Sequence, residues 1–417
     1  MTTTPASSLD ISSQEFWHQT PRRRDHTFAV LRRDQPISFH PPPPIAIAQP
    51  LGLTEPRGFW AVVRHADVQH ISRHPDLFSS AKGVGFEDLP QELSEPVSSI
   101  VAMDPPRHDT LRRLISSAFT PRNVAKIETQ IAQQARIIVD ELLDTGDCDF
   151  VTQVAARLPM WTISEMIGID SADRERISHA ADLVIGASDE ELRDGEERLT
   201  STLNAIVTLH AAATDLASQR RDNPADDLMT ALVTAEIDGE RLTDADIASF
   251  FSLLCIAGND TTRHTTAHGM LALSQHPDQR TRLASDLPGL LETAVEELLR
   301  WGSVVIEFAR IATADVDLHG HTIRAGDRVV MFYESANHDE AVFVDPWDFD
   351  IAREPNRHLA FGGGGLHYCL GSHIARTQLR CLFTELLSRG QQIDIGEPIY
   401  LESVFMNALK HLPCTIR

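Results

Sequence analysis

The stretch FGGGGLHYCLGSHIAR, residues 361–376, places Cys369 between four consecutive glycines and a predicted helix. The glycines at 362–365 allow a tight turn with free backbone N–H groups, and apolar residues recur with helical spacing from Leu370 onward. A thiol at a helix N-terminus is stabilised as the thiolate, which is one of the ligands that a haem iron accepts. A phosphate-binding loop and a buried structural cysteine are alternatives at this point. A phosphate loop, however, carries Lys followed by Ser or Thr after its glycines, whereas residues 366–368 are Leu, His and Tyr.

Composition and charge restrict the class of protein. The chain has 417 residues, and 37 Lys and Arg against 60 Asp and Glu give a formal net charge of -23, which argues against nucleic acid or an anionic membrane as the main partner. Five scattered cysteines are typical of a reducing compartment rather than of a disulfide framework. The N-terminus lacks a signal pattern, and no apolar run approaches the roughly 18 residues that a membrane span needs. We therefore expect a cytoplasmic protein with no membrane span. The absence of a linker predicts a single domain over residues 1–417.

The first part of the chain offers few chemical signals. Residues 1–30 are predicted to be a loosely held leader with one short helix. A small sheet is expected within residues 45–63, and the apolar loop 81–96, which includes Phe86, is expected to contact a substrate. A helix follows within residues 104–119.

His108 and Arg112 lie four residues apart on this last helix and so share one face. Taken alone, the pair indicates a solvated face of the helix.

The longest predicted helix begins after Thr243, whose side chain can form a capping box with Asp246. The helical pattern continues to about residue 274. At 1.5 Å per residue, roughly 30 residues make a rod of about 45 Å, which is long enough to cross the molecule.

The centre of this helix reads AGNDTT at residues 257–262, which is a poor choice for a buried helix. Such a local conflict is expected where function overrides helix propensity. Gly258 would leave room for a ligand against the helix, and Thr261 can bond back to a carbonyl. A simple kink with a hydrogen-bonded Asp is the alternative.

The last third of the chain mixes helix and strand. Glu297 and Arg300 lie three apart on a predicted helix over residues 290–301 and can pair, which is common in helices. Strands are predicted at 308–312, 316–319 and 329–332, and a hairpin over 403–413 with Phe405 and Met406 near its tip.

Three spaced signatures together resemble the cytochrome P-450 monooxygenases, and the resemblance covers nearly the whole chain. They are AGNDTT at 257–262, Glu-Leu-Leu-Arg at 297–300 and GGGGLHYCLG at 362–371. The resemblance implies a mainly α fold, a helical triangular prism with a small β-rich region. It also implies a haem b (iron protoporphyrin IX) cofactor that activates O2 to oxidise a hydrophobic small molecule.

The family's site residues carry over by position. Cys369 would be the axial ligand of the haem iron, and Asp260 and Thr261 would form the acid–alcohol pair that delivers protons. The haem propionates would be held by the cationic residues His108, Arg112, Arg310 and His367. A buried structural triad is expected from Glu297, Arg300 and Arg353. The substrate pocket is expected to be lined by Phe86, Ala257, Val304, Val305, Phe405 and Met406. Cys255 is expected to serve packing.

Two departures from the family pattern concern the substrate. Phe361 stands eight residues before Cys369 where seven is commonest, and Val304 replaces a frequent proline. The first departure, with stretches such as TAEIDGERL and KHLP, is similar to actinobacterial methyl-branched lipid ω-hydroxylases and sterol side-chain oxidases. Terminal hydroxylation of a methyl-branched lipid, an isoprenoid or a sterol side chain is therefore expected. The alternatives are tailoring of a macrolide or terpenoid, a haem sensor or carrier, and a peroxide-using haem enzyme.

Electrons are expected from outside the chain, because the sequence has no flavin or nicotinamide motif. The resemblance implies a ferredoxin and an NAD(P)H-dependent ferredoxin reductase. A basic docking face for the ferredoxin is predicted, with ordinary solvated arginines as the alternative. Its members would be Arg107, Arg112, Arg113, Arg122, Arg376 and Arg380.

Overall fold

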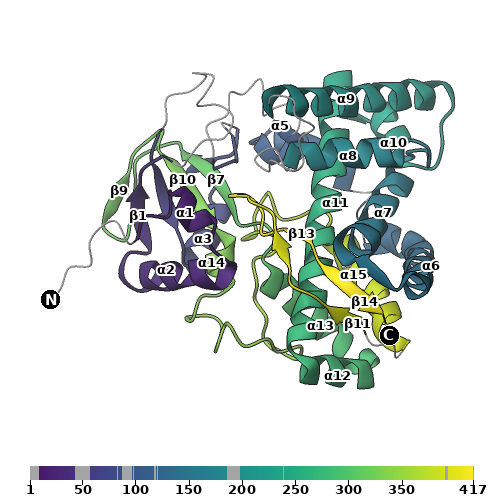
Figure 1. The fold of residues 1–417 in the computed structure, drawn as a ribbon. Coiled ribbons are helices and arrows are strands. Elements are labelled where there is room, and N and C mark those ends of the chain that lie inside the picture. The colour runs from purple at the N-terminus through teal and green to yellow at the C-terminus, as the bar shows by residue number, and fades with distance from the viewer. Residues whose placement is uncertain are drawn as a thin grey trace.

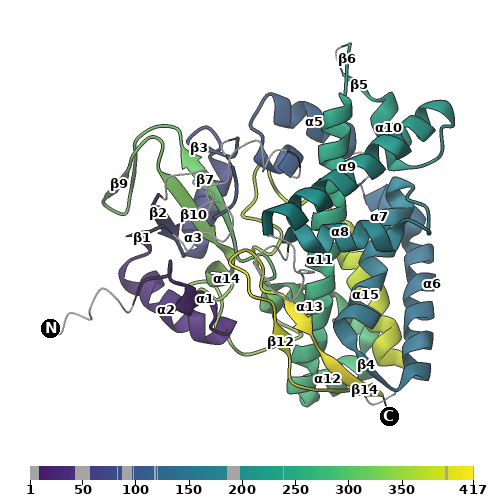
Figure 2. The ribbon, with the colours of Figure 1, turned by 45° about the horizontal axis from the view of Figure 1, so that its top comes forward.

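Helices and strands separate into two sides of the molecule, as Figure 1 and Figure 2 show. The structure, a computed structural model, describes residues 9–42, 57–81, 83–86, 96, 98–116, 119, 121–185, 198–237, 239–389 and 393–416. The predicted mainly α architecture with a small β-rich part is confirmed. The segment 45–47 of the predicted small sheet lies outside the described residues.

The long helix α11 (Asp244–Gln275) passes through the middle of the helical side (Figure 1). It has the predicted capping box, in which Asp246 N donates to Thr243 Oγ1 at 3.1 Å and Thr243 N donates to Asp246 Oδ2 at 3.2 Å. It packs against α7 (Arg157–Ile167), α8 (Arg174–Ile185), α9 (Arg198–Asp222) and α13 (Leu287–Gly302). Its predicted extent and its role as a rod through the helical side are thus confirmed.

A second group of helices closes the core behind α11. Helix α15 (Ser372–Ser388) lies along α6 (Pro121–Thr145) and contacts α13, and the three share one apolar cluster. Leu298 and Phe383 are fully or almost fully buried within it. Further helices whose bounds lie within the described residues are α1 (Gln14–Trp17), α2 (Pro21–Asp34), α3 (His65–Arg73), α5 (Arg107–Ser116), α10 (Leu228–Thr234), α12 (Pro277–Ser285) and α14 (Tyr333–Ala336), with short 3₁₀ and π segments at Ser99–Ala102 and Val151–Ala155.

The larger sheet has the strand order β1-β2-β10-β7-β3. The strands are β1 (Ile37–His40), β2 (Phe59–Val62), β10 (Arg328–Phe332), β7 (Glu307–Ala312) and β3 (Phe78–Ser79). Only the β2–β10 pair among these is parallel. The central strand β10 is buried along its whole length, which explains its continuous apolar run. The predicted strands at 308–312 and 329–332 are confirmed. The predicted strand at 316–319 corresponds to β8 (Val316–Leu318), which forms a hairpin with β9 (His321–Ile323).

The prediction of a loosely held N-terminal leader is wrong for the described residues from 9 onward. The side chains of Ile11, Phe28 and Leu31 are completely buried, the last two on α2. The run of charges in PRRRD hid this amphipathic helix. One of these charges, Arg24, is itself buried in an ion pair with Glu334 at 2.8 Å.

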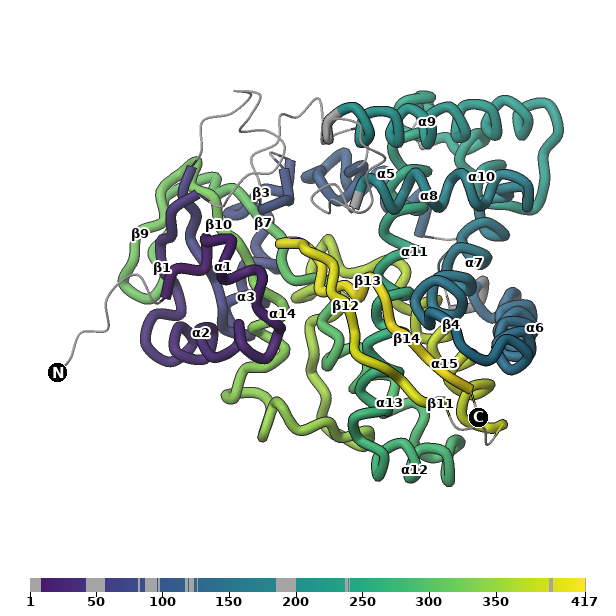
Figure 3. Tube along the Cα trace, in the orientation of Figure 1, coloured from purple at the N-terminus to yellow at the C-terminus, as the bar shows by residue number. Residues whose placement is uncertain are grey.

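The C-terminal strands return to the helical side (Figure 3). A three-stranded sheet has the order β11-β14-β4, formed by β11 (Ile393–Ile395), β14 (Pro413–Ile416) and β4 (Asp147–Asp149). The predicted hairpin exists, with Phe405 and Met406 in its connection, but its first strand lies before the predicted start at residue 403: β12 (Ile399–Tyr400) pairs with β13 (Leu409–His411). A further short hairpin joins β5 (Glu236–Ile237) and β6 (Glu240–Arg241). Within the described ranges, no helix has both the length and the apolar character of a membrane span.

Candidate active site

Cys369 lies at the end of the glycine loop, just before α15. Three of the four glycines at 362–365 have φ between 77° and 98°, the left-handed region that favours glycine. A side chain at Gly365 would collide with the backbone carbonyl of Ser72 on α3. The Cys369 N–H donates to Phe361 O at 3.0 Å and fixes the end of the loop. The glycines therefore allow the chain to turn tightly against α3 and to present the sulfur.

Opposing influences act on the Cys369 thiol. Burial raises its pKa and outweighs the Gly371 N–H and the charges of Arg112 and Arg376, which lower it. Helix α15 begins at Ser372, so the thiol lies just before a helix N-terminus, and the Gly371 N–H lowers the thiol pKa against the larger effect of burial. A metal ion would supply the missing positive charge, since a coordinating thiol is deprotonated outright.

The four predicted cationic residues come together beside this loop from three separate segments. The imidazole rings of His108 on α5 and His367 have centroids 4.6 Å apart. Arg112, one turn further along α5, donates to Tyr368 O at 2.6 Å. Burial, together with the charges of Arg310, His108 and Arg112, lowers the pKa of His367 to about 2. Arg310 belongs to β7, so the site joins the sheet to the helical side.

This cluster fits the two carboxylates of a haem. His108 Nε2 is buried and has no hydrogen-bond partner among the described residues. The buried guanidinium of Arg310 donates to the carbonyl of its own neighbour Ala309 at 2.6 Å, and burial lowers its pKa. A buried guanidinium beside a buried imidazole nitrogen that has no partner in the described residues favours an anionic partner. The residues present therefore match a dianionic cofactor whose metal takes a thiolate.

The centre of α11 is accessible on one face. Ala257 is exposed and Thr261 is partly exposed although helices pack around α11. Thr261 Oγ1 donates to Ala257 O at 2.7 Å, as the sequence predicted for a back-bonded threonine. Gly258 does not leave room for a ligand. Its missing side chain is replaced by the side chain of Ile163 on α7, so this glycine serves helix packing.

Asp260 is buried and holds an unusual carboxyl group. Arg263 Nη1 lies 3.1 Å from Asp260 Oδ1 and also donates to Asp182 Oδ1 at 2.8 Å. Burial raises the pKa of Asp260 to about 7, against the lowering by Arg263 and with a further rise from Asp182. Asp260 Oδ2 has no hydrogen-bond partner in the described part of the chain. Asp260 is therefore poised to gain and lose a proton near neutral pH.

The predicted pocket residues separate into two groups. Val304 and Met406 belong to one small apolar cluster that Phe405 packs against, and Val305 forms a β-bridge with Met406. Phe86, in contrast, is buried in the aromatic core of the sheet side, so the prediction that it lines the pocket is not supported. Its ring lies 4.7 Å from that of Phe59, 5.8 Å from Trp17 and 6.1 Å from Phe332.

Glu297, Arg300 and Arg353 are brought together in the interior. Glu297 and Arg300 have no exposed surface and form a bidentate pair with both distances 2.7 Å, and Arg353 Nε lies 3.2 Å from Glu297. Asn356 Nδ2 donates to the same carboxylate at 3.0 Å. Arg300 also donates to Asn337 O at 3.0 Å, which ties α13 to the segment after α14.

Comparison with known proteins decides the family. Residues 160–391 match the cytochrome P450 family. The chain belongs to this family. The structure of "Mycobacterium marinum cytochrome P450 CYP268A2 in complex with pseudoionone" matches with a TM-score of 0.94 and 47% identity, covering 100% of both chains.

Two kinds of curated P450 relative are similar to this chain. The methyl-branched lipid omega-hydroxylase of Mycobacterium tuberculosis is 43% identical over 417 residues, covering 99% of this chain and 95% of the relative. The steroid C26-monooxygenase of Mycolicibacterium smegmatis is 36% identical over 389 residues, covering 92% and 88%. This P450 is thus a monooxygenase of a family that binds haem through a thiolate and works with O2 and redox partners.

One part of the P450 network was missed at the level of sequence. Glu296, next to Glu297, binds Arg376 at 2.6 Å and His358 at 3.0 Å, so it links α13 to the cysteine loop and α15. Burial alone would raise the pKa of Glu296, but hydrogen bonds from Arg376 and His358 lower it to about 2. The sequence signal for this network is that Glu297 is preceded by a second acid, Glu296. The partners of Glu296 could not be predicted, because they are more than 60 residues away in sequence.

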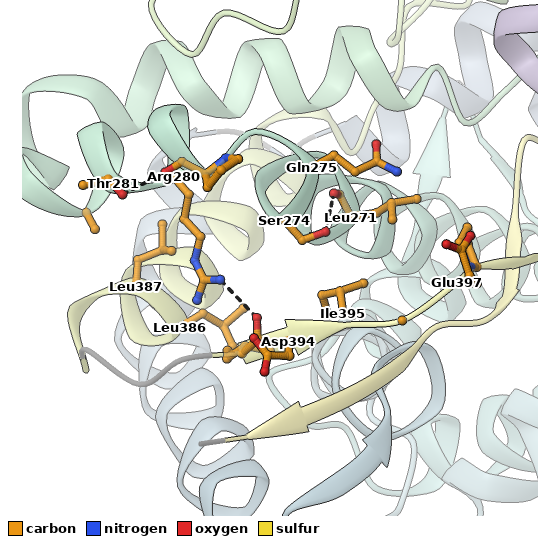
Figure 4. A pocket seen from close by; sticks show the side chains of 15 residues that line it. Leu271, Ser274, Gln275, Arg280, Thr281, Leu386, Leu387, Asp394, Ile395 and Glu397 are labelled. Carbon is orange, nitrogen blue, oxygen red and sulfur yellow. Dashed lines mark hydrogen bonds between the residues drawn. The ribbon is translucent and has the colours of Figure 1, made fainter.

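A cleft of about 690 Å³ lies elsewhere on this P450 (Figure 4). It is formed by the end of α11, by α12, by α15 and by β11, and Arg280 crosses it to donate to Ile393 O at 3.1 Å. None of the predicted site residues lines it, so it is separate from the candidate active site.

Proposed function

We propose that this P450 hydroxylates the terminal carbon of a methyl-branched lipid, an isoprenoid or a sterol side chain. The observation that carries the proposal is the 43% identity, over 99% of the chain, to a protein named methyl-branched lipid omega-hydroxylase. The apolar Val304, Phe405 and Met406 cluster supports it, because an aliphatic chain gains affinity from apolar contact. Tailoring hydroxylation of a macrolide or terpenoid is the alternative.

A spectral titration tests the substrate. Purified ferric protein is titrated with branched fatty acids, acyclic isoprenoids, sterols and macrolides, and the change from low to high spin is followed. The proposal expects branched lipids, isoprenoids or sterols to give this change. A response confined to bulky cyclic metabolites would replace it with the tailoring reaction. No response to any of these classes would remove both assignments.

Residues 1–417 form one catalytic domain in this proposal, and haem b is its cofactor. Cys369 binds the iron, and His108, Arg112, Arg310 and His367 hold the propionates. The haem, when bound, supplies the reductive activation of dioxygen and the transfer of one oxygen atom to carbon. Support for the single domain comes from buried Asn337. It accepts from Arg300 on α13 and donates to Ser303 Oγ at 3.0 Å, which joins the two sides of the molecule.

Proton delivery falls to Asp260 and Thr261. The Asp260 carboxyl takes up a proton near neutral pH, and Arg263 and Asp182 fix its orientation. The Thr261 hydroxyl lies on the accessible face of α11 and passes the proton toward the reaction site.

Replacing Thr261 by alanine should uncouple electron use from product formation. Without the Thr261 hydroxyl, protons are no longer delivered to the reaction site at the step that needs them. We expect product per NAD(P)H consumed to fall by about tenfold while peroxide release rises and haem content stays constant. The matched control is Thr266→Ala, because Thr266 Oγ1 makes the same bond to the carbonyl four residues earlier, Thr262 O, at 2.9 Å but is buried. Coupling equal to wild type in Thr261→Ala would remove the proposed role.

Coupling should also depend on pH through Asp260. Its pKa is raised to about 7, so the proton-bearing form predominates below pH 7 and is lost as the pH rises through 7. Between pH 6 and pH 8 the protonated fraction falls about tenfold, and the coupled fraction should fall with it. Asp260→Asn should give a low and flat profile. A wild-type profile that stays flat, or an Asn profile that keeps the slope, would contradict the assignment.

The electron donor in this proposal is a ferredoxin reduced by an NAD(P)H-dependent reductase. The predicted basic docking face is weaker than its sequence implied, because Arg107 pairs with Asp246, Arg376 with Glu296 and Arg380 with Glu292. Arg113 is exposed on α5, and its Nε donates to a backbone carbonyl at 3.4 Å. The docking face therefore centres on α5.

Reversal of charge at Arg113 tests this docking face. We expect Arg113→Glu to slow reduction by an acidic ferredoxin by about tenfold at low ionic strength, and the difference to shrink as salt is added. Arg33→Glu is the control and should leave the rate constant unchanged, because α2 lies at the lower left of the molecule in Figure 1, away from α5 at the top. Equal rates and equal salt dependence for Arg113→Glu and wild type would argue for another docking surface.

A further inference from the structure

Two cysteines face each other across the C-terminal sheet. Cys148 on β4 and Cys414 on β14 are direct partners in the antiparallel register, and their Sγ atoms lie within hydrogen-bond distance, 2.7 Å apart. Both are free thiols. The Phe150 N–H to Leu412 O and Ile416 N–H to Gly146 O bonds on either side place this pair at a hydrogen-bonded position of the ladder. Cα atoms at such positions are about 5.5 Å apart, within the span of a disulfide.

The two thiols differ in exposure and in pKa, so that one can react with an oxidant in solvent and the other can then react with the first. Cys148 is partly exposed, whereas Cys414 is 4% exposed. The hydrogen bond with Cys414 lowers the pKa of Cys148, against the effects of burial and of Asp149 and Asp147. The same bond raises the pKa of Cys414. Cys148 is therefore the nucleophile that solvent can reach, and Cys414 is the partner held behind it.

The other three cysteines offer no such arrangement. Cys255 is completely buried on α11, and burial raises its pKa well above the range in which a thiolate forms. Cys381 lies on α15, where burial raises its pKa to about 11. Cys369 is the proposed haem ligand.

We infer that Cys148 and Cys414 form a reversible disulfide driven by hydrogen peroxide. The Cys148 thiolate attacks one peroxide oxygen, the O–O bond breaks, and a sulfenic acid and one water result after proton uptake. The Cys414 sulfur then attacks the sulfenic sulfur, forms the S–S bond and releases a second water. The two thiols lose two electrons and two protons, and one hydrogen peroxide becomes two water molecules. A dithiol reductant reverses the step.

The bond would fasten β14 to β4 beside the start of the helical core. β4 leads directly into the π-helical turn and α7, both of which contact α11. Asp149, next to Cys148, already binds the chain before β14 through Leu412 N at 3.0 Å and His411 Nδ1 at 2.8 Å. The disulfide adds a covalent link at a contact that joins residues far apart in sequence, where a cross-link restricts the unfolded chain most. This modification is independent of which substrate the enzyme oxidises.

Peptide mapping of the holoenzyme tests the inference. Protein is incubated with a small excess of hydrogen peroxide, remaining thiols are alkylated after denaturation, and the digest is analysed without reduction. We expect a linked peptide pair containing Cys148 and Cys414, a loss of two alkylated cysteines, and recovery of both after dithiothreitol. Cys381→Ser is the matched control and should form the same link. Oxidation of Cys148 to sulfinic acid with Cys414 still alkylated, or a link between other cysteines, would overturn the inference.

A thermal measurement supplies an independent readout. The oxidised holoenzyme should melt about 3 to 6 °C above the reduced form, because the link restricts the unfolded chain. The same treatment should leave the melting temperature of Cys414→Ser unchanged. An equal rise in the melting temperature of Cys414→Ser, or no rise in wild type that carries the mapped link, would show that the disulfide does not stabilise the fold.

Discussion

Replacement of Cys369 by serine should yield folded protein that lacks the thiolate band in its carbon monoxide difference spectrum. A serine hydroxyl in this buried loop stays neutral and cannot donate the electron density that a thiolate gives to the iron. Burial already raises the pKa of the native thiol, so the site offers even less support to a harder alkoxide. We expect product formation below about 1% of wild type, which corresponds to a barrier higher by about 3 kcal/mol.

The control for this variant is Cys381→Ser on the following helix. Cys381 is a partly buried thiol that packs against the same apolar cluster, so it tests the cost of losing a sulfur from this region. The control should keep the spectrum and at least most of the activity. If Cys369→Ser retained the thiolate band, another cysteine would have to be the ligand.

Neutralising Glu297 should have the largest effect on stability. The carboxylate is completely buried and receives hydrogen bonds from Arg300, Arg353 and Asn356, as well as from the Asp350 N–H at 3.1 Å. Glu297→Gln leaves two guanidinium groups without their counter-charge in the interior. We expect the free energy of unfolding to fall by about 3 to 5 kcal/mol, with loss of haem during purification.

Glu292→Gln, on the same helix, is the matched control. Glu292 also pairs with an arginine, Arg380, at 3.3 Å, but its side chain is 72% exposed. Removing this exposed pair should change the free energy of unfolding by less than about 1 kcal/mol. Equal losses in the free energy of unfolding for the two substitutions, measured by denaturant unfolding, would mean that the buried network stabilises the protein no more than the exposed pair does.

Local patterns could be predicted well because their causes lie within a few residues. The Thr243–Asp246 capping box, the extent of α11 and the glycine turn before Cys369 follow from caps, helical periodicity and backbone freedom, and the structure has all three. The back-bond of Thr261 follows in the same way.

Contacts between distant segments could not be derived from local patterns. His108 and His367 are 259 positions apart, and only the resemblance to a family brought them to one site before the structure did. The pairing of Glu296 with Arg376 was missed for the same reason. The sequence pattern around an apolar side chain such as Phe86 is the same whether the side chain contacts a ligand or packs in the core. The missing side chain of Gly258 is equally compatible with a ligand or with Ile163.

The order β11-β14-β4 has a consequence for how the protein is made. On the ribosome, β4 emerges long before β14, the strand that lies between it and β11. Until then β4 has unpaired edges, and its short length and its two aspartates, Asp147 and Asp149, make those edges poor templates for other chains. The three-stranded sheet and the helices that rest on it can close only late, after nearly all of these residues have been synthesised. Nascent chains of this protein therefore carry an incomplete sheet through most of translation, although their composition is rich in helix.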